Sequence, residues 1–301
     1  MFSLRPVSSA AFACPAKLNL LLAVTGRRPD GFHELVSVVA PVEFGDTLTV
    51  GPADDFSLIC NDPTVPADGT NLVLKAAQAF RAATGWNGGA WFELTKRIPM
   101  GAGLGGGSSD AASALRALNG LAGGLLAPAA LAQVAAEVGS DCPLFLAGGP
   151  VVMRGRGERV EQLREPAAGR LRGRRVLIFK PGFAVATPWA FARIAARSGA
   201  GYRPGAEAEA RLANYLHVVG AGAAGDAELF NDLECDVFAK FVALPVLLEQ
   251  LRGQFGLFPR MSGSGSACFA LLPEGASVAA VTAAVRAAWG PSALVIATRL
   301  A

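Results

Sequence analysis

Pro99-Met-Gly-Ala-Gly-Leu-Gly-Gly-Gly-Ser-Ser-Asp110 is the most informative segment of this chain, and five of its twelve residues are glycine. It runs directly into residues 111–118, which are mostly strong helix formers. Glycines let successive backbone N–H groups turn toward one concave point, and a helix that begins there adds free N–H groups and its positive dipole end. Because such an arrangement binds phosphate, the segment predicts an enzyme that handles phosphate groups. The hydroxyls of Ser108 and Ser109 are placed to cap the helix, to contact a phosphate oxygen or to hold Mg²⁺.

Two better-known glycine loops are disfavoured. The spacing Gly101-x-Gly103-x-x-Gly106 matches the dinucleotide-binding pattern, but no Asp or Glu lies between Asp110 and Glu137. That fold needs an acidic residue about 20 positions after the glycines to bind the ribose. The P-loop ends in Gly-Lys-Ser/Thr, and this segment contains no lysine. The sequence therefore predicts phosphate binding by backbone geometry, with cationic help from another part of the chain.

Composition limits the class of protein. At 301 residues the chain can form one large domain or two ordinary ones. Hydrophobic residues make up 52% and charged residues 17%, which argues against disorder. The net charge of +3 is too small to indicate a nucleic-acid partner.

Membrane insertion and secretion are disfavoured as well. The longest charge-free run, residues 117–136, contains asparagine, glutamine, proline and glycines, and the N-terminus lacks an apolar stretch of signal-peptide length. Five scattered cysteines form no metal-binding or redox pair and are predicted to be buried thiols. We therefore expect a cytoplasmic protein that is a monomer or a weak homodimer.

Patterns of apolar residues predict a mixed α+β chain with two domains, residues 1–168 and 169–301. Eight arginines and three glutamates between residues 154 and 175, without aromatic residues, indicate a solvated hairpin and a linker between the domains. Strands are expected at residues 33–39, 47–50, 56–59, 91–95, 176–179, 267–272 and 294–299, and a hairpin at 151–163. Helices are expected at residues 71–84, 109–118, 128–138, 189–197, 206–216, 229–241, 245–255 and 276–289.

Lys17 is the first candidate for chemistry. Only five of the 27 basic residues are lysine, and this one is followed by Leu-Asn-Leu-Leu-Leu in an apolar strand. A buried ammonium needs a partner, which a carboxylate such as Asp141 would provide. The pair would lower the pKa of the acid and stabilise charge on a transferred phosphoryl group. The alternative is a lysine at a strand end whose amine reaches water.

Asp141 and His33 are further candidates. Asp141 lies between Gly139-Ser140 and Cys142-Pro143, where it is either a general base or a helix N-cap. Phe32-His33 follows the polar turn Gly-Arg-Arg-Pro-Asp-Gly at the head of a strand. A histidine there is either solvated or, with the adjacent aromatic ring, able to stack on and hydrogen-bond a heterocyclic base.

Three segments together resemble the motifs of the GHMP kinases, in order and at suitable distances: Pro15-Ala-Lys-Leu-Asn-Leu20, residues 99–109 and Met261-Ser-Gly-Ser-Gly-Ser266. Thr25-Gly-x-Arg-x-Asp-Gly-Phe-His33, Gly139-Ser-Asp141 and Lys180-Pro-Gly182 narrow the resemblance. It covers most of the chain and favours the branch whose acceptor is a cytidine diphosphate-linked methylerythritol, an intermediate of the non-mevalonate isoprenoid pathway. The implied reaction transfers the γ-phosphoryl group of ATP, with Mg²⁺, to the 2-hydroxyl of that acceptor.

The resemblance also implies roles for particular residues. Lys17 and Asp141 take the catalytic positions, and Asn19 helps to hold the acceptor hydroxyl. The cytosine lies between Phe32, where the family commonly has tyrosine, and a second ring at Phe191 or Trp189, and His33 hydrogen-bonds it. Ala186 stands where the family often has serine. The ATP phosphates are bound by Pro99, Met100, Gly101, Ala102, Gly103, Leu104, Gly105, Gly106, Gly107, Ser108 and Ser109, with residues 261–266 close by. No protein ligand of the metal is identified, because phosphate and water commonly supply most ligands of Mg²⁺.

The fold implied by the resemblance is the two-domain GHMP kinase fold. Its N-terminal domain is a ribosomal-S5-like α/β domain with an unusual left-handed crossover, its C-terminal domain is ferredoxin-like, and the active site lies between them. Two other functions remain open at this point. One is a GHMP kinase with a small acceptor such as homoserine or mevalonate, and the other is a nucleotide-binding sensor on the same fold that needs neither Lys17 nor Asp141.

Overall fold

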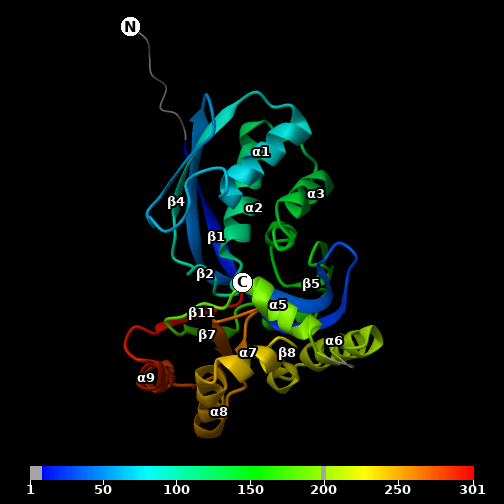
Figure 1. The fold of residues 1–301 in the computed structure, drawn as a ribbon, viewed down its shortest axis with the longest axis vertical. Helices are drawn as coiled ribbons and strands as arrows, with labels where there is room; N and C mark the ends of the chain where they lie inside the picture. The colour runs from blue at the N-terminus through cyan, green and yellow to red at the C-terminus, as the bar shows by residue number, and fades with distance from the viewer. Residues whose placement is uncertain (1–8, 198–200) are drawn as a thin grey trace. The chain divides into compact units, whose positions relative to one another are not determined.

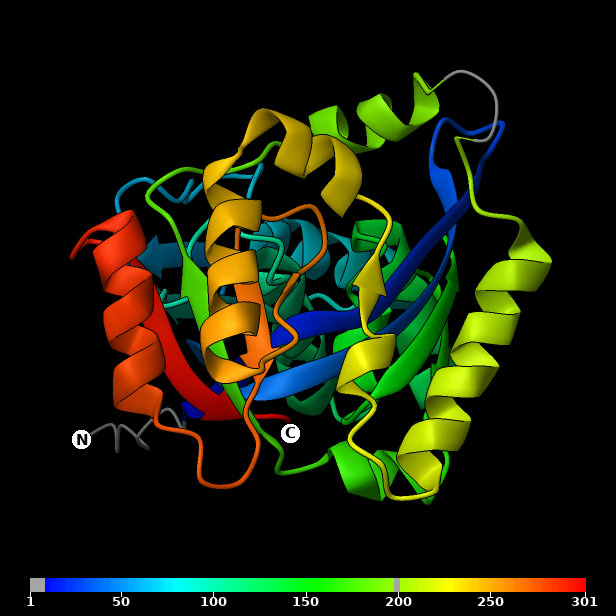
Figure 2. The same ribbon diagram turned by 90° about the horizontal axis from the view of Figure 1, so that it is seen from below.

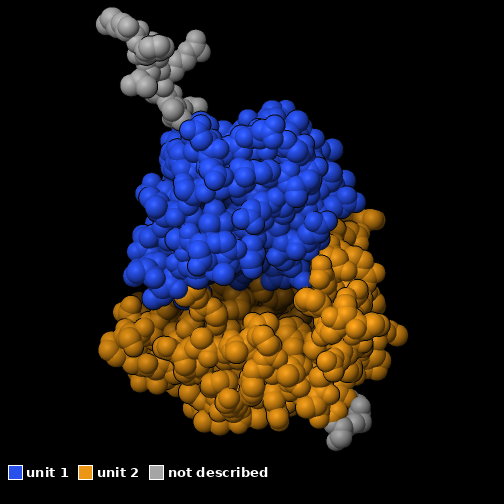
Figure 3. All heavy atoms as spheres, turned by 45° about the horizontal axis from the view of Figure 1, so that its top comes forward, with its two compact units in different colours: residues 1–16, 45–99, 105–148 blue, residues 17–44, 100–104, 149–301 orange. Residues whose placement is uncertain are grey.

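The computed structural model describes residues 9–197 and 201–301. Its contacts divide the chain into two compact units, coloured separately in Figure 3. Unit 1 contains the residues up to 16, 45–99 and 105–148, and unit 2 contains residues 17–44, 100–104 and 149–301. Strands β1 (Ala10–Arg27) and β2 (His33–Ala53) therefore each contribute to both units. These units are discontinuous in sequence, and the division into domains at residue 168 stays a prediction.

Unit 1 is a sheet with helices on one side (Figure 1). β4 (Gly89–Thr95) pairs with β3 (Ser57–Cys60) in parallel and with the end of β2 antiparallel. The helices α1 (Leu72–Thr84), α2 (Gly106–Leu121) and α3 (Pro128–Val138) pack on it through a shared core that includes Phe80, Phe92 and Leu115. The short helix η1 (Pro143–Leu146) follows α3. This packing fixes the direction of α2, whose first turn carries the glycine-rich segment.

The ends of helices α1 and α2 follow different rules. In α1, the Asn71 side chain accepts a hydrogen bond from the Val73 N–H, and Gly85 ends the helix in the left-handed conformation, as predicted. In α2, the N-cap is Gly105, with φ +73°, and no side chain caps the helix. The prediction of a start at residue 109 with capping serines is therefore wrong. Because Gly105 takes the left-handed conformation, the helix begins three residues earlier, and both serines lie inside its first turns.

The sheets of unit 2 are formed by segments far apart in the chain. β1 pairs in parallel with β8 (Phe230–Asn231), while β2 pairs with β5 (Val151–Gly155), which forms a hairpin with β6 (Arg159–Gln162). A second sheet has the order β11-β7-β10-β9 and is antiparallel throughout. Its strands are β7 (Arg175–Lys180), β9 (Arg260–Met261), β10 (Cys268–Leu271) and β11 (Leu294–Arg299).

Helices α8 (Ala243–Phe255) and α9 (Val278–Trp289) cover one face of the second sheet (Figure 2). Leu247, Leu251 and Val285 from these helices join Phe179 in one buried core. The remaining helical segments of unit 2 are α4 (Ala167–Leu171), α5 (Thr187–Ala195), α6 (Gly205–Gly220), η2 (Asp226–Glu228) and α7 (Glu234–Lys240).

Some predicted elements differ from the observed ones. The strand expected at 47–50 is the continuation of β2, and the helix expected at 229–241 splits into β8 and α7. The split arises because the Asn231 side chain donates hydrogen bonds to the carbonyls of Met261 and Gly263, which holds this segment extended. The hairpin at 151–163 is confirmed, but the linker after it contains helix α4.

Cysteine burial was predicted correctly for three of the five thiols. Cys60 is half-buried and Cys235 is exposed, because they lie at a strand end and in the first turn of a surface helix, so the prediction is wrong for these two. Among the described residues, no helix is long and apolar enough to cross a membrane.

Candidate active site

The first part of the glycine loop packs on the turn at 261–266 within unit 2. Gly103 has φ +75°, and a Cβ there would lie 2.1 Å from the carbonyl oxygen of Ser262. The Ser262 hydroxyl donates to the Gly103 carbonyl at 3.1 Å, and the Ala267 N–H donates to the Ala102 carbonyl, also at 3.1 Å. This backbone-to-backbone approach has no room for a side chain, which is the physical reason for glycine at position 103.

Lys17 and Asn19 lie beside the same pair of loops. The Lys17 N–H donates to the Leu104 carbonyl at 2.9 Å, and its ammonium donates to Asn19 Oδ1. A Cβ on Gly263 would lie 3.1 Å from Lys17 Nζ and 3.3 Å from Asn19 Oδ1. Lys17 is 5% exposed, so the alternative of an amine that reaches water is wrong: the residue lies within β1 rather than at its end. Three segments separated by more than 80 residues each thus meet around one ammonium group.

The second part of the loop and the Asp141 turn are neighbours within unit 1. A Cβ on Gly139 would lie 3.1 Å from Cys142 Sγ and 3.8 Å from Ser108 Oγ. The Ser108 side chain forms a hydrogen bond with the Cys142 thiol. The turn that carries Asp141 therefore lies beside the first turn of α2. Asp141 is half-buried and precedes the N-cap of η1, which is Cys142, so the N-cap interpretation of Asp141 is wrong.

Lys17 belongs to unit 2 and Asp141 to unit 1. Each is in the local environment that its candidate role requires: a buried ammonium beside a glycine turn, and a half-buried carboxylate beside a helix N-terminus. Their pairing stays a prediction.

The turn before β2 presents Phe32 and His33. The Arg28 guanidinium pairs with Asp30, whose carboxylate accepts the Phe32 N–H at 3.1 Å, and Gly31 has φ +86°. Burial and the charge of Arg27 lower the pKa of His33, so its ring is neutral at pH 7. The Phe32 ring is 48% exposed, and the Arg156 guanidinium lies 4.9 Å from its centre.

His33 packs between two further rings of unit 2. Its ring centre lies 5.0 Å from that of Phe191 and 5.9 Å from that of Tyr202. Its Nε2 atom is buried and has no hydrogen-bond partner among residues 9–197 and 201–301, which is unusual for a polar atom. A ligand with a matching polar edge would satisfy it. The alternative that His33 is solvated is therefore wrong for this atom.

Of the two candidate stacking residues, Phe191 is the one in contact with His33. Trp189 instead packs on Phe241 and under the Lys240 ammonium, at 5.8 Å and 4.4 Å from its ring centre. Both residues are on α5, but they face different sides of the helix. Phe191 therefore fits the predicted position of the second aromatic ring.

Tyr202 and Thr187 were missed by sequence reasoning. The Tyr202 hydroxyl is buried without a partner in the described part of the chain, and Thr187 Oγ1 lies 2.7 Å from Ser264 Oγ in the glycine turn. Ala186 lacks the hydroxyl that the family often has at this position. The next residue, Thr187, has a hydroxyl that contacts the turn. The sequence carries no local signal for Tyr202.

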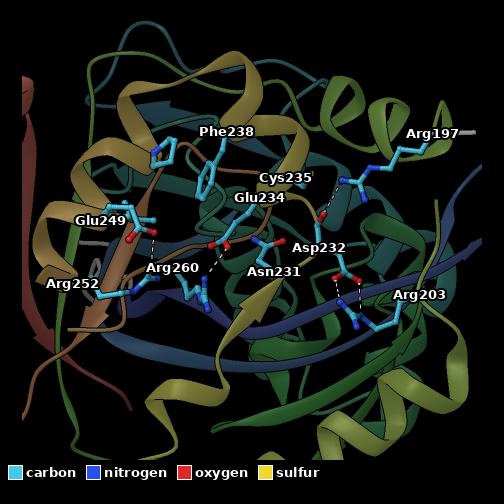
Figure 4. Close-up of a pocket in the computed structure, with 12 residues that line it drawn as sticks. Arg197, Arg203, Asn231, Asp232, Glu234, Cys235, Phe238, Glu249, Arg252 and Arg260 are labelled. Carbon is cyan, nitrogen blue, oxygen red and sulfur yellow. Dashed lines mark hydrogen bonds and ion pairs between the residues drawn. The ribbon is translucent and has the colours of Figure 1, made fainter. Parts of the chain in front are cut away.

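Unit 2 also contains a pocket of about 520 Å³, which is shown in Figure 4. Its lining includes none of the candidate residues named above. The charges in it are already paired: Arg197 with Asp236, Arg203 with Asp232, Arg252 with Glu249, and Arg260 with Glu234. We therefore place the candidate active site at the glycine loop and not in this pocket.

Comparison with known proteins gives consistent matches. Residues 71–149 match the model of the GHMP kinases N-terminal domain, and residues 218–291 match that of the GHMP kinases C-terminal domain. A 4-diphosphocytidyl-2-C-methyl-D-erythritol kinase of Synechococcus sp. (strain CC9902) is 42% identical over 271 residues, which cover 86% of each chain. The enzyme of the same name from Salinibacter ruber is 37% identical over 91% of each chain. A crystal structure of 4-(cytidine 5'-diphospho)-2C-methyl-D-erythritol kinase superposes with a TM-score of 0.75 at 34% identity, over 97% of this chain and all of that one.

Proposed function

The chain belongs to the family of 4-diphosphocytidyl-2-C-methyl-D-erythritol kinases, and on that premise we propose the reaction and the roles of its residues. It transfers the γ-phosphoryl group of ATP to the 2-hydroxyl of 4-diphosphocytidyl-2-C-methyl-D-erythritol, in the non-mevalonate isoprenoid pathway. The α+β GHMP kinase fold expected from the sequence is confirmed by the same matches. The protein acts on small molecules in the cytoplasm, as a monomer or weak homodimer.

One observation carries the identity of the acceptor: the buried, unpartnered Nε2 of His33 beside the Phe191 ring, among the residues that the structure describes. A neutral imidazole can hydrogen-bond the polar edge of cytosine, and the rings of Phe32 and Phe191 offer it faces for stacking. A small acceptor such as homoserine or mevalonate needs neither ring nor imidazole. These residues therefore favour a cytidine-containing acceptor.

Phosphoryl transfer depends mainly on positioning and on stabilisation of charge. The backbone N–H groups of residues 100–108, which include the N-terminus of α2, bind the ATP phosphates, with the 261–266 turn close by. The Lys17 ammonium offsets the negative charge on the transferred group, and Asn19 holds that ammonium in place through Oδ1. Asp141 holds the acceptor hydroxyl and takes up its proton, while the hydroxyl oxygen forms the new bond to phosphorus and the bond from phosphorus to the ADP oxygen breaks.

Mg²⁺ accompanies ATP in this proposal. Ser109 Oγ is buried, has no hydrogen-bond partner in the described chain and lies in the first turns of α2, so it fits as the protein's ligand. When bound, the ion neutralises phosphate charge, and the remaining ligands come from phosphate and water. Among residues 9–197 and 201–301, no group of three acidic, histidine or cysteine side chains forms an alternative site.

Two substitutions test these roles. His33→Ala removes the group assigned to the base, so the KM for the cytidyl acceptor should rise at least about tenfold, the equivalent of one hydrogen bond to a buried group, while the KM for ATP stays within twofold. Asp141→Asn should abolish the phosphorylated product observed by ³¹P NMR while both ligands still bind. Equal acceptor KM values for wild type and His33→Ala would remove His33 from the site. A wild-type protein that binds both ligands without forming product would instead be a sensor.

A further inference from the structure

Beneath the start of α2, unit 1 contains a buried cluster of one lysine and two aspartates. Lys96 Nζ donates to Asp46 Oδ2, and it lies 2.8 Å from Asp110 Oδ2. The side chains of Lys96, Asp46 and Asp110 are 7%, 0% and 4% exposed. Charges this deeply buried are costly unless they are paired, so an ordinary surface position would be cheaper for the fold.

The cluster holds the two chain segments that lead into and out of the glycine loop. The other oxygen of Asp46, Oδ1, accepts the N–H groups of Arg97 and Ile98, the latter at 2.7 Å, directly before Pro99. Asp110 is on the second turn of α2, which leaves the loop. Lys96 therefore links the entry of the loop, through Asp46, to its exit, through Asp110.

The packing around this link leaves little room for a side chain at Gly106. A Cβ on Gly106, the first residue of α2, would lie 3.0 Å from Ile98 Cγ2 and 3.2 Å from Lys96 Nζ. The helix start is thus in direct contact with the ammonium group and with the residue whose N–H is fixed by Asp46. A shift of the ammonium would move the first turn of α2, where the N–H groups of the anion-binding end lie.

The two carboxylates of the cluster repel each other, and one ammonium group is shared between them. Burial raises the pKa of Asp110 to about 7, the attraction of Lys96 opposes this shift, and the nearby Asp46 carboxylate adds to it. The titratable groups that face Asp110 are Lys96, which directly follows β4, Asp46 on β2 and the Cys14 thiol on β1, whose own pKa is raised to about 12 by burial. Among the described residues, Asp110 Oδ1 has no hydrogen-bond partner, so Lys96, at Oδ2, is the group that compensates this carboxylate.

We propose that Lys96, Asp46 and Asp110 are positioning residues for ATP: they hold both ends of the glycine loop so that its N–H groups are already arranged to bind phosphate. The proposal deepens the proposed function and rests on it. It assigns these three residues no contact with either substrate. It predicts an effect on nucleotide affinity that is separate from the binding of the acceptor and from the chemical step.

Asp46→Asn is the first test. Its Oδ1 can still accept the two backbone N–H groups, but its amide faces the Lys96 ammonium, so the link between the loop ends is broken. We expect the KM for ATP to rise about tenfold, the equivalent of one charge-assisted hydrogen bond, while kcat and the acceptor KM stay within twofold. Asp55→Asn, an exposed carboxylate of the same unit paired with Arg81, is the matched control and should leave all three values unchanged.

Asp110→Asn is the second test. It keeps the shape of the cluster but removes the charge that pairs with Lys96 at the exit of the loop. We expect the KM for ATP to rise, while kcat and the acceptor KM stay within twofold. If Asp46→Asn fails to fold, this variant decides alone.

Two results would overturn the proposal: a folded Asp46→Asn protein with the wild-type KM for ATP, or a folded Asp110→Asn protein with the wild-type KM for ATP. The measurements are repeated as equilibrium binding of ATP without acceptor. Wild type that binds ATP more tightly than the two variants but forms no product would refute the proposed function and leave the positioning role standing.

Discussion

Besides Lys17, two further lysines with buried side chains, one in each unit, have opposite surroundings. Lys96 of unit 1 is held by the carboxylates of Asp46 and Asp110, whereas Lys180 of unit 2, at the end of β7, donates to the backbone carbonyls of Pro181 and Phe183 at 3.0 Å and 2.8 Å. No ion pair of Lys180 is present within the described chain. In a protein that otherwise uses arginine, both positions need a compact cation with several donors.

The two sites shift the pKa of the amine in opposite directions. Burial alone lowers the pKa of Lys180. Burial also acts to lower that of Lys96, but the attraction of Asp110 and Asp46 outweighs it and raises the pKa. The comparison shows that a buried lysine is not by itself a sign of catalysis. Lys96 links charged groups across the fold, and Lys180 fixes a loop of backbone.

The largest expected difference between them concerns stability. Lys96→Met leaves two buried carboxylates without a counter-ion and should lower the free energy of unfolding by about 3–5 kcal/mol. Lys180→Met leaves two carbonyls with one fewer donor and should cost about 1–3 kcal/mol. Urea denaturation of both variants at pH 7.5 measures the difference. Equal losses would show that the carboxylates around Lys96 find other partners.

A smaller expected effect is the dependence of stability on pH, which differs between the two sites. The pKa of Asp110 is raised from 3.8 to about 7 in the folded protein, so the stability due to its protonated form is full below 3.8 and lost as the pH rises through 7. Asp110→Asn removes this loss. The free energy of unfolding of the variant, minus that of wild type, should therefore be larger at pH 8 than at pH 5. The expected difference is at least about 1.4 kcal/mol, the equivalent of one pKa unit. A gain that is the same at both pH values would mean that Asp110 titrates normally.

The smallest effect is expected at Lys180. Its pKa is lowered below the ordinary 10.5, so the folded protein releases this proton before the unfolded chain does, and stability due to this group rises with pH up to 10.5. The free energy of unfolding of wild type, relative to that of Lys180→Met, should therefore rise between pH 8 and pH 10. Denaturation curves at the two pH values suffice, and an opposite trend would mean that Lys180 has an acidic partner.

Local sequence patterns predicted much of this molecule. The glycine that ends helix α1 follows from neighbouring residues, and the structure has it. The burial of Lys17 was one of two alternatives, and the structure has that one. The capping of α2 by serine was wrong because the conformation of one glycine, Gly105, moved the helix start. Such a change of φ leaves no trace in the pattern of apolar residues.

Contacts between distant segments were beyond the sequence. Asp46 and Lys96 are 50 residues apart and meet because β2 and β4 pair with Thr47 opposite Thr95. A shift of one residue in that register would turn Asp46 to the other face. Tyr202 reaches His33 from a different element in the same way, through tertiary packing alone. Composition singled out Lys17 from the five lysines, but only the strand register identifies Lys96 as important.

An assay of ADP release tests the central claim most directly. Wild-type protein with Mg-ATP is offered 4-diphosphocytidyl-2-C-methyl-D-erythritol, homoserine or mevalonate at equal concentration. The account predicts rapid ADP release with the cytidyl acceptor and background rates with the other two. Turnover of homoserine or mevalonate in preference to the cytidyl compound would contradict it.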